Sequence, residues 1–135
     1  MIYTRSTWPK GRWPNFTFSE MVCKETGECD MDEAFMDSLQ ELRVRVEEKL
    51  RVTSGFRSIF HSIEAYKRFP GAHPKGMAAD ILAAGGLKHK ILEHAFQMGF
   101  TGIGIAPGFI HLDRMDETFH AHRPTVWCYP TDRNY

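Results

Sequence analysis

Apolar and polar positions alternate with the period of a helix in the segment that begins at Asp32. Apolar side chains recur every three or four residues, with charged and amide side chains between them, at Phe35, Leu39, Leu42, Val46 and Leu50. Asp30 followed by Glu33 resembles a capping box at the start of this segment. The pattern predicts an amphipathic helix that serves as scaffold.

A second helical pattern follows the pair Gly85-Gly86 and ends near Gly99. Its apolar positions are Leu87, Ile91, Leu92, Ala95 and Phe96. This segment is also predicted to be a scaffold helix, and its two histidines, His89 and His94, are predicted to be ordinary exposed or partly packed side chains.

Short runs rich in apolar residues predict four strands, at residues 50–53, 77–82, 102–106 and 109–113. The turn signal Pro107-Gly108 separates the last two, which therefore read as a hairpin. Together the elements predict an α+β fold, with the helices packed on one face of a small antiparallel sheet.

The first 15 residues contain two Trp-Pro pairs, Trp8-Pro9 and Trp13-Pro14, which disfavour a helix. We expect an N-terminal arm over residues 1–15, extended and with its indoles packed on one domain formed by residues 16–135. Packing is the favoured role of these tryptophans because large aromatic side chains mainly contribute buried area. A platform for carbohydrate or peptide is the alternative.

Composition narrows the class of protein. The 135 residues are 42% hydrophobic, which suffices for one core, and Lys plus Arg balance Asp plus Glu at 17 each. Without net charge we expect no nucleic-acid partner. No apolar run approaches the roughly 20 residues of a membrane span, and the N-terminal residues lack the apolar stretch of a secretory signal. We expect a protein made in the cytoplasm without a signal peptide.

Three cysteines, Cys23, Cys29 and Cys128, do not suit a complete disulfide framework. Reduced, partly buried thiols are the favoured interpretation. A Cys23–Cys29 bridge and a second metal site remain as alternatives.

Four residues have the types and spacing of a metal site. His73 and Asp80 flank Pro74-Lys75-Gly76, where a turn would bring both side chains together. His111 and Asp113 lie two apart in a predicted strand and so project from one face. Two imidazoles and one carboxylate form a catalytic zinc set. Histidines that bind no metal are the alternative that spacing leaves open.

Three blocks of sequence resemble the signature blocks of the M15 peptidases. They are Ser54-Gly55-Phe56-Arg57-Ser58, then His73-Pro74-Lys75-Gly76-Met77-Ala78-Ala79-Asp80, and Phe109-Ile110-His111-Leu112-Asp113. That family includes zinc D-alanyl-D-alanine carboxypeptidases and dipeptidases and phage L-alanyl-D-glutamate endopeptidases, and it shares its fold with the hedgehog signalling domain. Residues 18–20, Arg123-Pro124, Trp127 and Tyr129 also resemble the branch with a short HxD block, so the resemblance spans roughly residues 16–129.

The resemblance implies that His73, Asp80 and His111 bind Zn²⁺. It also implies a substrate-binding role for Ser54 and Arg57, with Arg57 holding a substrate carboxylate or stabilising a developing oxyanion, which suits its paired donors. A structural ion pair is the alternative for Arg57.

Two positions depart from the family's pattern. The Ser that usually opens the second block is Gly71, and the position three before the last zinc ligand, acidic in many relatives, is Gly108. Asp113 is the preferred general base because it lies beside His111. Its alternative role is to orient a ligand or to pair with Arg57.

The stretch between Asp113 and Arg123 holds further candidates for an acid, base or substrate clamp, although loop side chains of these types are mostly solvated. They are Glu117, His120 and His122. His61, like the two helix histidines, is left out of the predicted site.

The resemblance makes peptidoglycan peptides the expected substrate. The lack of a signal peptide and of a separate wall-binding domain suggests a phage or prophage enzyme, released at lysis or carried on a virion. A non-catalytic zinc domain that serves as a binding or assembly module is the rival hypothesis, favoured by Gly108. A domain that binds no metal is a third.

Overall fold

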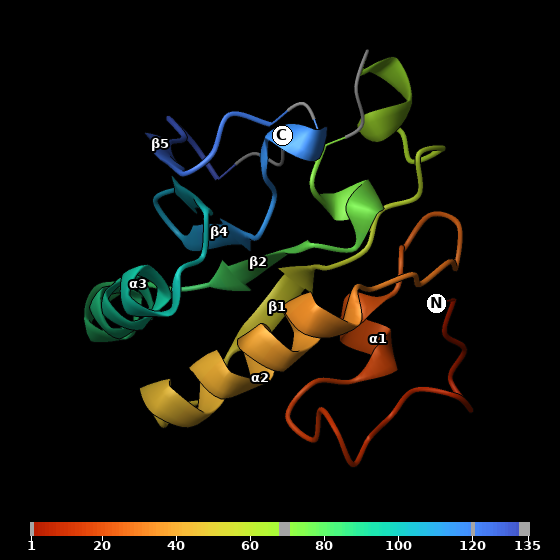
Figure 1. Cartoon of the computed structure of the whole chain (residues 1–135), viewed down its shortest axis with the longest axis horizontal. Coiled ribbons are helices and arrows are strands. Elements are labelled where there is room, and N and C mark those ends of the chain that lie inside the picture. Colours follow the sequence, from red (N-terminus) through yellow and green to blue (C-terminus); the bar gives the residue numbers. More distant parts are fainter. Residues whose placement is uncertain (1, 68–70, 120, 133–135) are drawn as a thin grey trace.

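A computed structural model describes residues 2–67, 71–119 and 121–132 of the chain. Helices and strands combine in an α+β fold around a five-stranded sheet, as Figure 1 shows, and the predicted fold class is confirmed. The strand order is β1-β2-β4-β3-β5. The strands are β1 (Arg51–Ser54), β2 (Ala78–Leu82), β3 (Gly102–Ile105), β4 (Phe109–Asp113) and β5 (Thr125–Cys128).

In the part of the chain that the structure describes, three α-helices and three short 3₁₀ helices accompany the sheet. The α-helices are α1 (Phe18–Met21), α2 (Glu33–Val46) and α3 (Gly85–Met98), and the 3₁₀ helices are η1 (Glu64–Tyr66), η2 (His73–Lys75) and η3 (Glu117–Phe119). No helix among the described residues combines the length and the apolar character needed to cross a membrane.

The two faces of the sheet have different compositions. On one face, apolar side chains of β2, β3 and β4 join those of α2 and α3 in a single core, among them Ile81, Ile103, Ile110, Phe35 and Ile91. On the other face, alternation along β2 and β4 places Asp80, His111 and Asp113, and these side chains are buried as well. The sheet therefore has an apolar, helix-covered face and a face that carries the polar residues.

The boundaries of α2 differ from those predicted. Its N-cap is Asp32, whose side chain accepts a hydrogen bond from the Phe35 backbone N–H, so the predicted capping box of Asp30 and Glu33 is wrong. The helix stops at Val46 because Glu47 adopts a left-handed conformation, with φ of 60°. Leu50, predicted on the helix face, is instead a buried residue just before β1.

The chain forms its capping box at α1, a helix that the sequence pattern did not predict. Thr17 accepts from the Glu20 backbone N–H, and the Glu20 side chain accepts from the Thr17 backbone N–H in return. At four residues, α1 is too short for a hydrophobic period to reveal it.

Strand β5 was also not predicted, and it makes the sheet mixed. It pairs parallel to β3, with Gly104 opposite Trp127, whereas the other three pairings are antiparallel. The four predicted strands are present, and β3 and β4 form the predicted hairpin.

The N-terminal segment folds in turns instead of running extended. The backbone N–H of Trp8 donates to Thr4 and that of Trp13 donates to Pro9. Both indoles are buried, as the favoured interpretation expected, and the indole of Trp13 donates to Asp37 of α2. The division of the chain after residue 15 stays a prediction.

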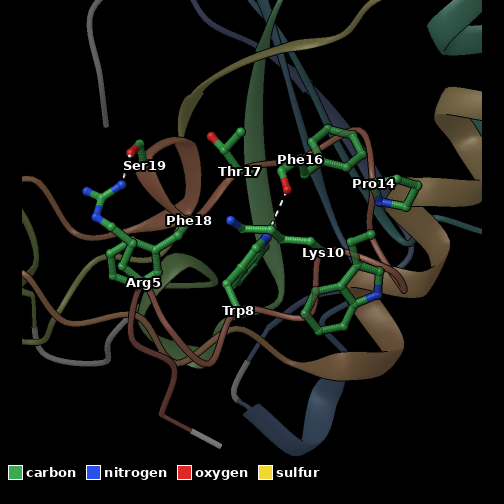
Figure 2. Close-up of a pocket in the computed structure, with 9 residues that line it drawn as sticks. Arg5, Trp8, Lys10, Pro14, Phe16, Thr17, Phe18 and Ser19 are labelled. Atoms are coloured by element: carbon green, nitrogen blue, oxygen red, sulfur yellow. Dashed lines mark hydrogen bonds between the residues drawn. The ribbon is translucent and has the colours of Figure 1, made fainter.

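A pocket of about 470 Å³ lies beside these tryptophans (Figure 2). Aromatic rings form much of its lining, and the side chains of Arg5 and Lys10 stand at it. The indole of Trp8 donates across it to the carbonyl of Phe16. None of the predicted site residues lines this pocket.

The three cysteines are free thiols. Cys23 and Cys29 are buried and Cys128 is exposed, which agrees with the favoured interpretation. Burial raises the pKa of Cys29 to about 11, so this thiol is in its protonated, unreactive form at neutral pH.

The buried indole of Trp13 predicts a large contribution to stability. Replacing it with alanine should lower the free energy of unfolding by about 3–5 kcal/mol, since it removes a fully buried aromatic side chain. Phe96→Ala is the matched control because Phe96 is 56% exposed on α3, and it should change stability by about 0.5 kcal/mol or less. Urea denaturation measures both, and equal effects would contradict the burial of Trp13 in the core.

Candidate metal centre

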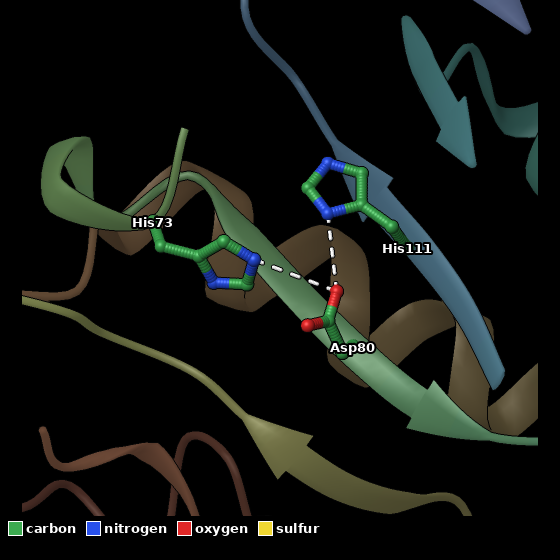
Figure 3. A group of neighbouring side chains, drawn as sticks. All are labelled: His73, Asp80 and His111. Atoms are coloured by element: carbon green, nitrogen blue, oxygen red, sulfur yellow. Dashed lines mark hydrogen bonds and ion pairs between the residues drawn. The ribbon is translucent and has the colours of Figure 1, made fainter. Parts of the chain in front are cut away.

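Three side chains meet on the polar face of the sheet, and Figure 3 shows them pointing toward one another. Asp80 lies in the middle of β2 and His111 is its direct partner in β4. His73 begins η2, and the chain then turns back into β2. The predicted turn at Pro74-Lys75-Gly76 is thus present.

Gly76 makes this turn possible. Its φ is 69°, in the left-handed region, and a Cβ there would overlap the carbonyl oxygen of Asp30. The carbonyl of Gly76 also accepts from the Asp32 backbone N–H, which ties the turn to the start of α2. The scaffold helix therefore fixes where His73 stands.

The potential ligand atoms converge on a space of the size that one ion occupies. Asp80 Oδ1 lies 3.1 Å from His111 Nδ1 and 3.4 Å from His73 Nε2, and one ligand atom from each residue lies within 4.8 Å of the others. All three side chains are buried. Two imidazole nitrogens and one carboxylate oxygen fit zinc and leave a coordination position for water or substrate.

The second nitrogen of each imidazole is held by an acceptor outside this triangle. His73 Nδ1 donates to the carbonyl of Gly55 at 2.7 Å, and His111 Nε2 donates to Asp113 Oδ2 at 2.7 Å. Such contacts fix the tautomer, so that the other nitrogen presents its lone pair to a metal. This arrangement is what distinguishes the site from a chance cluster of histidines.

The charges around Asp80 determine the protonation of the metal-free site. Burial alone would raise the pKa of Asp80, but the two histidines outweigh burial and hold it well below its usual range. Burial likewise would lower the pKa of His111, but hydrogen bonds to Asp113 and Asp80 raise it to about 9. Without metal, His111 is therefore protonated at neutral pH. A metal ion that binds His111 would have to displace that proton, so metal affinity is expected to increase with pH up to about 9.

Asp113 is fully buried and both of its oxygens are engaged. The guanidinium of Arg123 donates to Oδ1 at 2.9 Å and to Oδ2 at 2.7 Å, while the backbone N–H of Met115 donates to Oδ1. Although burial opposes ionisation, the contacts with His111 and Arg123 keep the pKa of Asp113 well below its usual range. The carboxylate fills the space above Gly102, where a Cβ would overlap it.

Arg57 is buried between two carboxylates. It donates to Glu64 at 2.9 Å and lies 3.5 Å from Asp80 Oδ2, and its Nε donates to the hydroxyl of Ser54. Ser54 in turn lies opposite Asp80 across the β1–β2 pair. Arg57 and Ser54 thus lie beside the candidate ligands, and the structural ion pair considered for Arg57 is present with Glu64.

Glu64 is the polar residue of this region that sequence reasoning missed. Its buried carboxylate also accepts from Lys67 at 2.8 Å and from the backbone N–H of Gly71 at 3.0 Å. The spacing of residues in the sequence does not predict a role for Glu64. The one available signal was that a buried arginine such as Arg57 needs a counter-ion. Gly71 therefore contributes a backbone contact to this buried carboxylate.

The remaining candidates lie outside the triangle of ligands. Glu117 is exposed in η3 and His122 is exposed, while His120 lies outside the described residues. The backbone N–H of Gly108 donates to the carboxylate of Asp132. Of the histidines left out, His61 pairs with Glu25, and His89 and His94 lie on α3 as predicted.

A mixed sheet that presents a buried His-Asp-His group opposite its helix-covered face has the features of a metallopeptidase domain. The family model described as Peptidase M15 matches residues 14–113, which include all three ligand candidates. The chain belongs to the M15 family of zinc-dependent peptidases. The search of curated proteins gave no match. The matched segment ends at Asp113, so β5 lies outside it.

Removal of one ligand should abolish zinc binding. His111→Ala deletes an imidazole and should leave less than a tenth of the zinc bound by the wild-type protein after dialysis, measured by atomic emission. Zinc should also raise the Tm of the wild-type protein but not that of the variant. His89→Ala is the matched control, because His89 is exposed on α3, and it should retain the metal. Full zinc in both variants would contradict the site.

Asp113→Asn tests the contact between Asp113 and His111. The variant keeps the size of the side chain but loses its charge, so His111 should be less well oriented and zinc affinity should fall about 10- to 100-fold. Competition with a chromophoric chelator measures the dissociation constant. Unchanged affinity combined with loss of hydrolysis would instead identify Asp113 as the general base.

Proposed function

We propose that this protein is a zinc metallopeptidase that hydrolyses an amide bond in peptidoglycan peptides. Membership of the M15 family supports a metallopeptidase, and the resemblance of the three sequence blocks to wall-degrading members supports the substrate class. The fold alone would not support a substrate, because one fold serves many functions. Action on the wall, after release at lysis or from a virion, is part of the proposal.

The observation that carries the proposal is that both ring nitrogens of His73 and of His111 have a defined partner. Each donates one N–H to an acceptor of the protein and turns its other nitrogen toward Asp80 Oδ1. Bound zinc would polarise the scissile carbonyl and lower the pKa of a water molecule to about 7. The protein's own contribution is a buried, pre-oriented ligand set that needs little rearrangement.

Arg57 and Asp113 are proposed to act beside the ligands. Arg57 is proposed to anchor a substrate carboxylate or to stabilise a developing oxyanion, with Glu64 and Ser54 holding its guanidinium in place. For Asp113, the low pKa and the contacts of both oxygens support positioning of His111 over proton abstraction. The general base is therefore the part of the mechanism that the Asp113→Asn experiment decides.

A binding or assembly module that holds zinc without catalysis is the second candidate function. Gly108 favours it, because the position that is acidic in many relatives has no side chain here. Zinc content does not separate the two functions, since both bind the metal. Hydrolysis does.

Digestion of purified peptidoglycan tests the proposal. Zinc-loaded protein should release peptides of defined mass, identified by mass spectrometry, and the chelated protein should release none. His73→Ala and His111→Ala should abolish release, whereas His89→Ala should match the wild-type protein. No release from several wall types by protein that holds one zinc per chain would favour the binding module.

A further inference from the structure

A chain of contacts leads from the candidate metal centre to the segment that precedes β5. His111 Nε2 donates to Asp113 Oδ2 at 2.7 Å. The guanidinium of Arg123 donates to both oxygens of the same carboxylate, at 2.9 and 2.7 Å. Arg123 lies between β4 and β5, shortly before Thr125 begins the last strand. One buried carboxylate thus connects the candidate ligand His111 with Arg123.

The contact with Arg123 is the one that can fix the rotation of the Asp113 carboxylate. Arg123 engages both oxygens at once, whereas His111 donates to Oδ2 alone and the backbone N–H of Met115 to Oδ1 alone. A paired contact of this kind sets the plane of the carboxylate as well as its distance. Gly102, the partner of Asp113 on β3, leaves room for the carboxylate but has no side chain to orient it.

Burial and an aromatic ring hold Arg123 itself in place. Its side chain is 15% exposed and that of Asp113 is 0% exposed, so little water competes with the pair. The guanidinium carbon lies 5.0 Å from the centre of the Trp127 ring, within the range of a cation–π contact. The ring of Trp127 in turn lies 5.2 Å from the ring of His111. The four side chains therefore form a closed circuit of contacts beside the candidate ligands.

We infer that Arg123 is a positioning residue of the candidate metal centre, which strengthens zinc binding by holding Asp113 in the orientation that fixes the imidazole of His111. In this role Arg123 acts through Asp113 and contacts neither the metal nor the substrate. The inference deepens the proposed function and rests only on its zinc-binding part, not on hydrolysis. Groups that orient a metal ligand usually contribute about 10- to 100-fold to metal affinity.

Charge and positioning predict opposite effects when Arg123 is removed. A guanidinium close to a metal site repels a divalent cation, so on charge alone Arg123→Gln would strengthen zinc binding. Loss of the paired contact with Asp113 would instead weaken it. The direction of the change in zinc affinity therefore separates the two explanations.

Two variants of Arg123 test the role. In Arg123→Gln the dissociation constant for zinc, measured by competition with a chromophoric chelator, should rise about 10-fold. Arg123→Lys keeps the charge but replaces the planar fork with a single donor group, so its dissociation constant should rise about threefold. Circular dichroism of the metal-free proteins checks that both fold, and Arg123→Lys is sufficient for the test where Arg123→Gln does not fold.

Arg12 provides the matched control, because it makes the same kinds of contact in the N-terminal segment. It donates to both oxygens of Asp37, at 2.9 and 2.8 Å, and its guanidinium carbon lies 5.4 Å from the centre of the Trp13 ring. Arg12→Gln should leave the dissociation constant for zinc within about twofold of the wild-type value, since separate sites act independently.

A double-mutant cycle shows whether Arg123 acts through Asp113. In the Asp113→Asn protein, Arg123→Gln should raise the dissociation constant by about threefold at most, because the carboxylate that it orients is gone. A second readout is the exchange of the His111 Nε2 proton with solvent, followed by NMR in zinc-loaded protein with labelled histidine. This exchange should be faster in Arg123→Gln than in the wild-type protein and unchanged in Arg12→Gln.

The outcomes separate this inference from the proposed function. Unchanged or tighter zinc binding in both Arg123 variants overturns the role of Arg123 and leaves the peptidase standing. Effects of Arg123→Gln and Asp113→Asn that add fully in the double variant overturn it as well. A wild-type protein that holds zinc but releases no wall peptide overturns the proposed hydrolysis, while weaker zinc binding by Arg123→Gln would still support the inference. A wild-type protein that binds no zinc overturns both.

Discussion

The pairing of Asp80 with His111 across β2 and β4 is the contact on which the rest of the site depends. The two residues are direct partners in the ladder, so backbone hydrogen bonds of the sheet fix the distance between a carboxylate and an imidazole. Both side chains are buried and polar, so they need partners. Arg57 lies beside Asp80, Asp113 accepts from His111, and Arg123 pairs with Asp113. Strands, rather than loops, thereby set the spacing of two of the three candidate ligands.

Local signals in the sequence were sufficient for much of this arrangement. Alternation in β4 predicted that His111 and Asp113 share a face, and the turn at Gly76 predicted that His73 and Asp80 meet. The apolar periods of α2 and α3 also predicted both helices. The ends of α2 were not predicted, because they depend on single residues, the N-cap Asp32 and the left-handed Glu47. The resemblance of three blocks then identified the class of chemistry.

The partners that come from distant parts of the chain could not be predicted in this way. Glu64 lies in η1 and reaches Arg57 of the loop after β1 only in the folded chain, and no hydrophobic period marks this contact. Strand β5 has four residues and alternating exposure, and it pairs in parallel with β3, a choice that only the assembled sheet determines. Local propensity contains no information on such long-range pairing.

Gly104 of β3 lies between two parts of the polar face, one formed by β2 and β4 and the other by β5. The strands β2 and β4 carry two of the candidate ligands, Asp80 and His111, whereas the aromatic rings of Trp127 and Tyr129 lie against β3 at Gly104, which has no side chain. Substitutions in β5 can therefore change the aromatic ring that packs beside His111 while Asp80 and His111 stay paired in β2 and β4. A change in β5 would thus alter the surroundings of the candidate ligands without altering the strand pairing that sets the distance between Asp80 and His111.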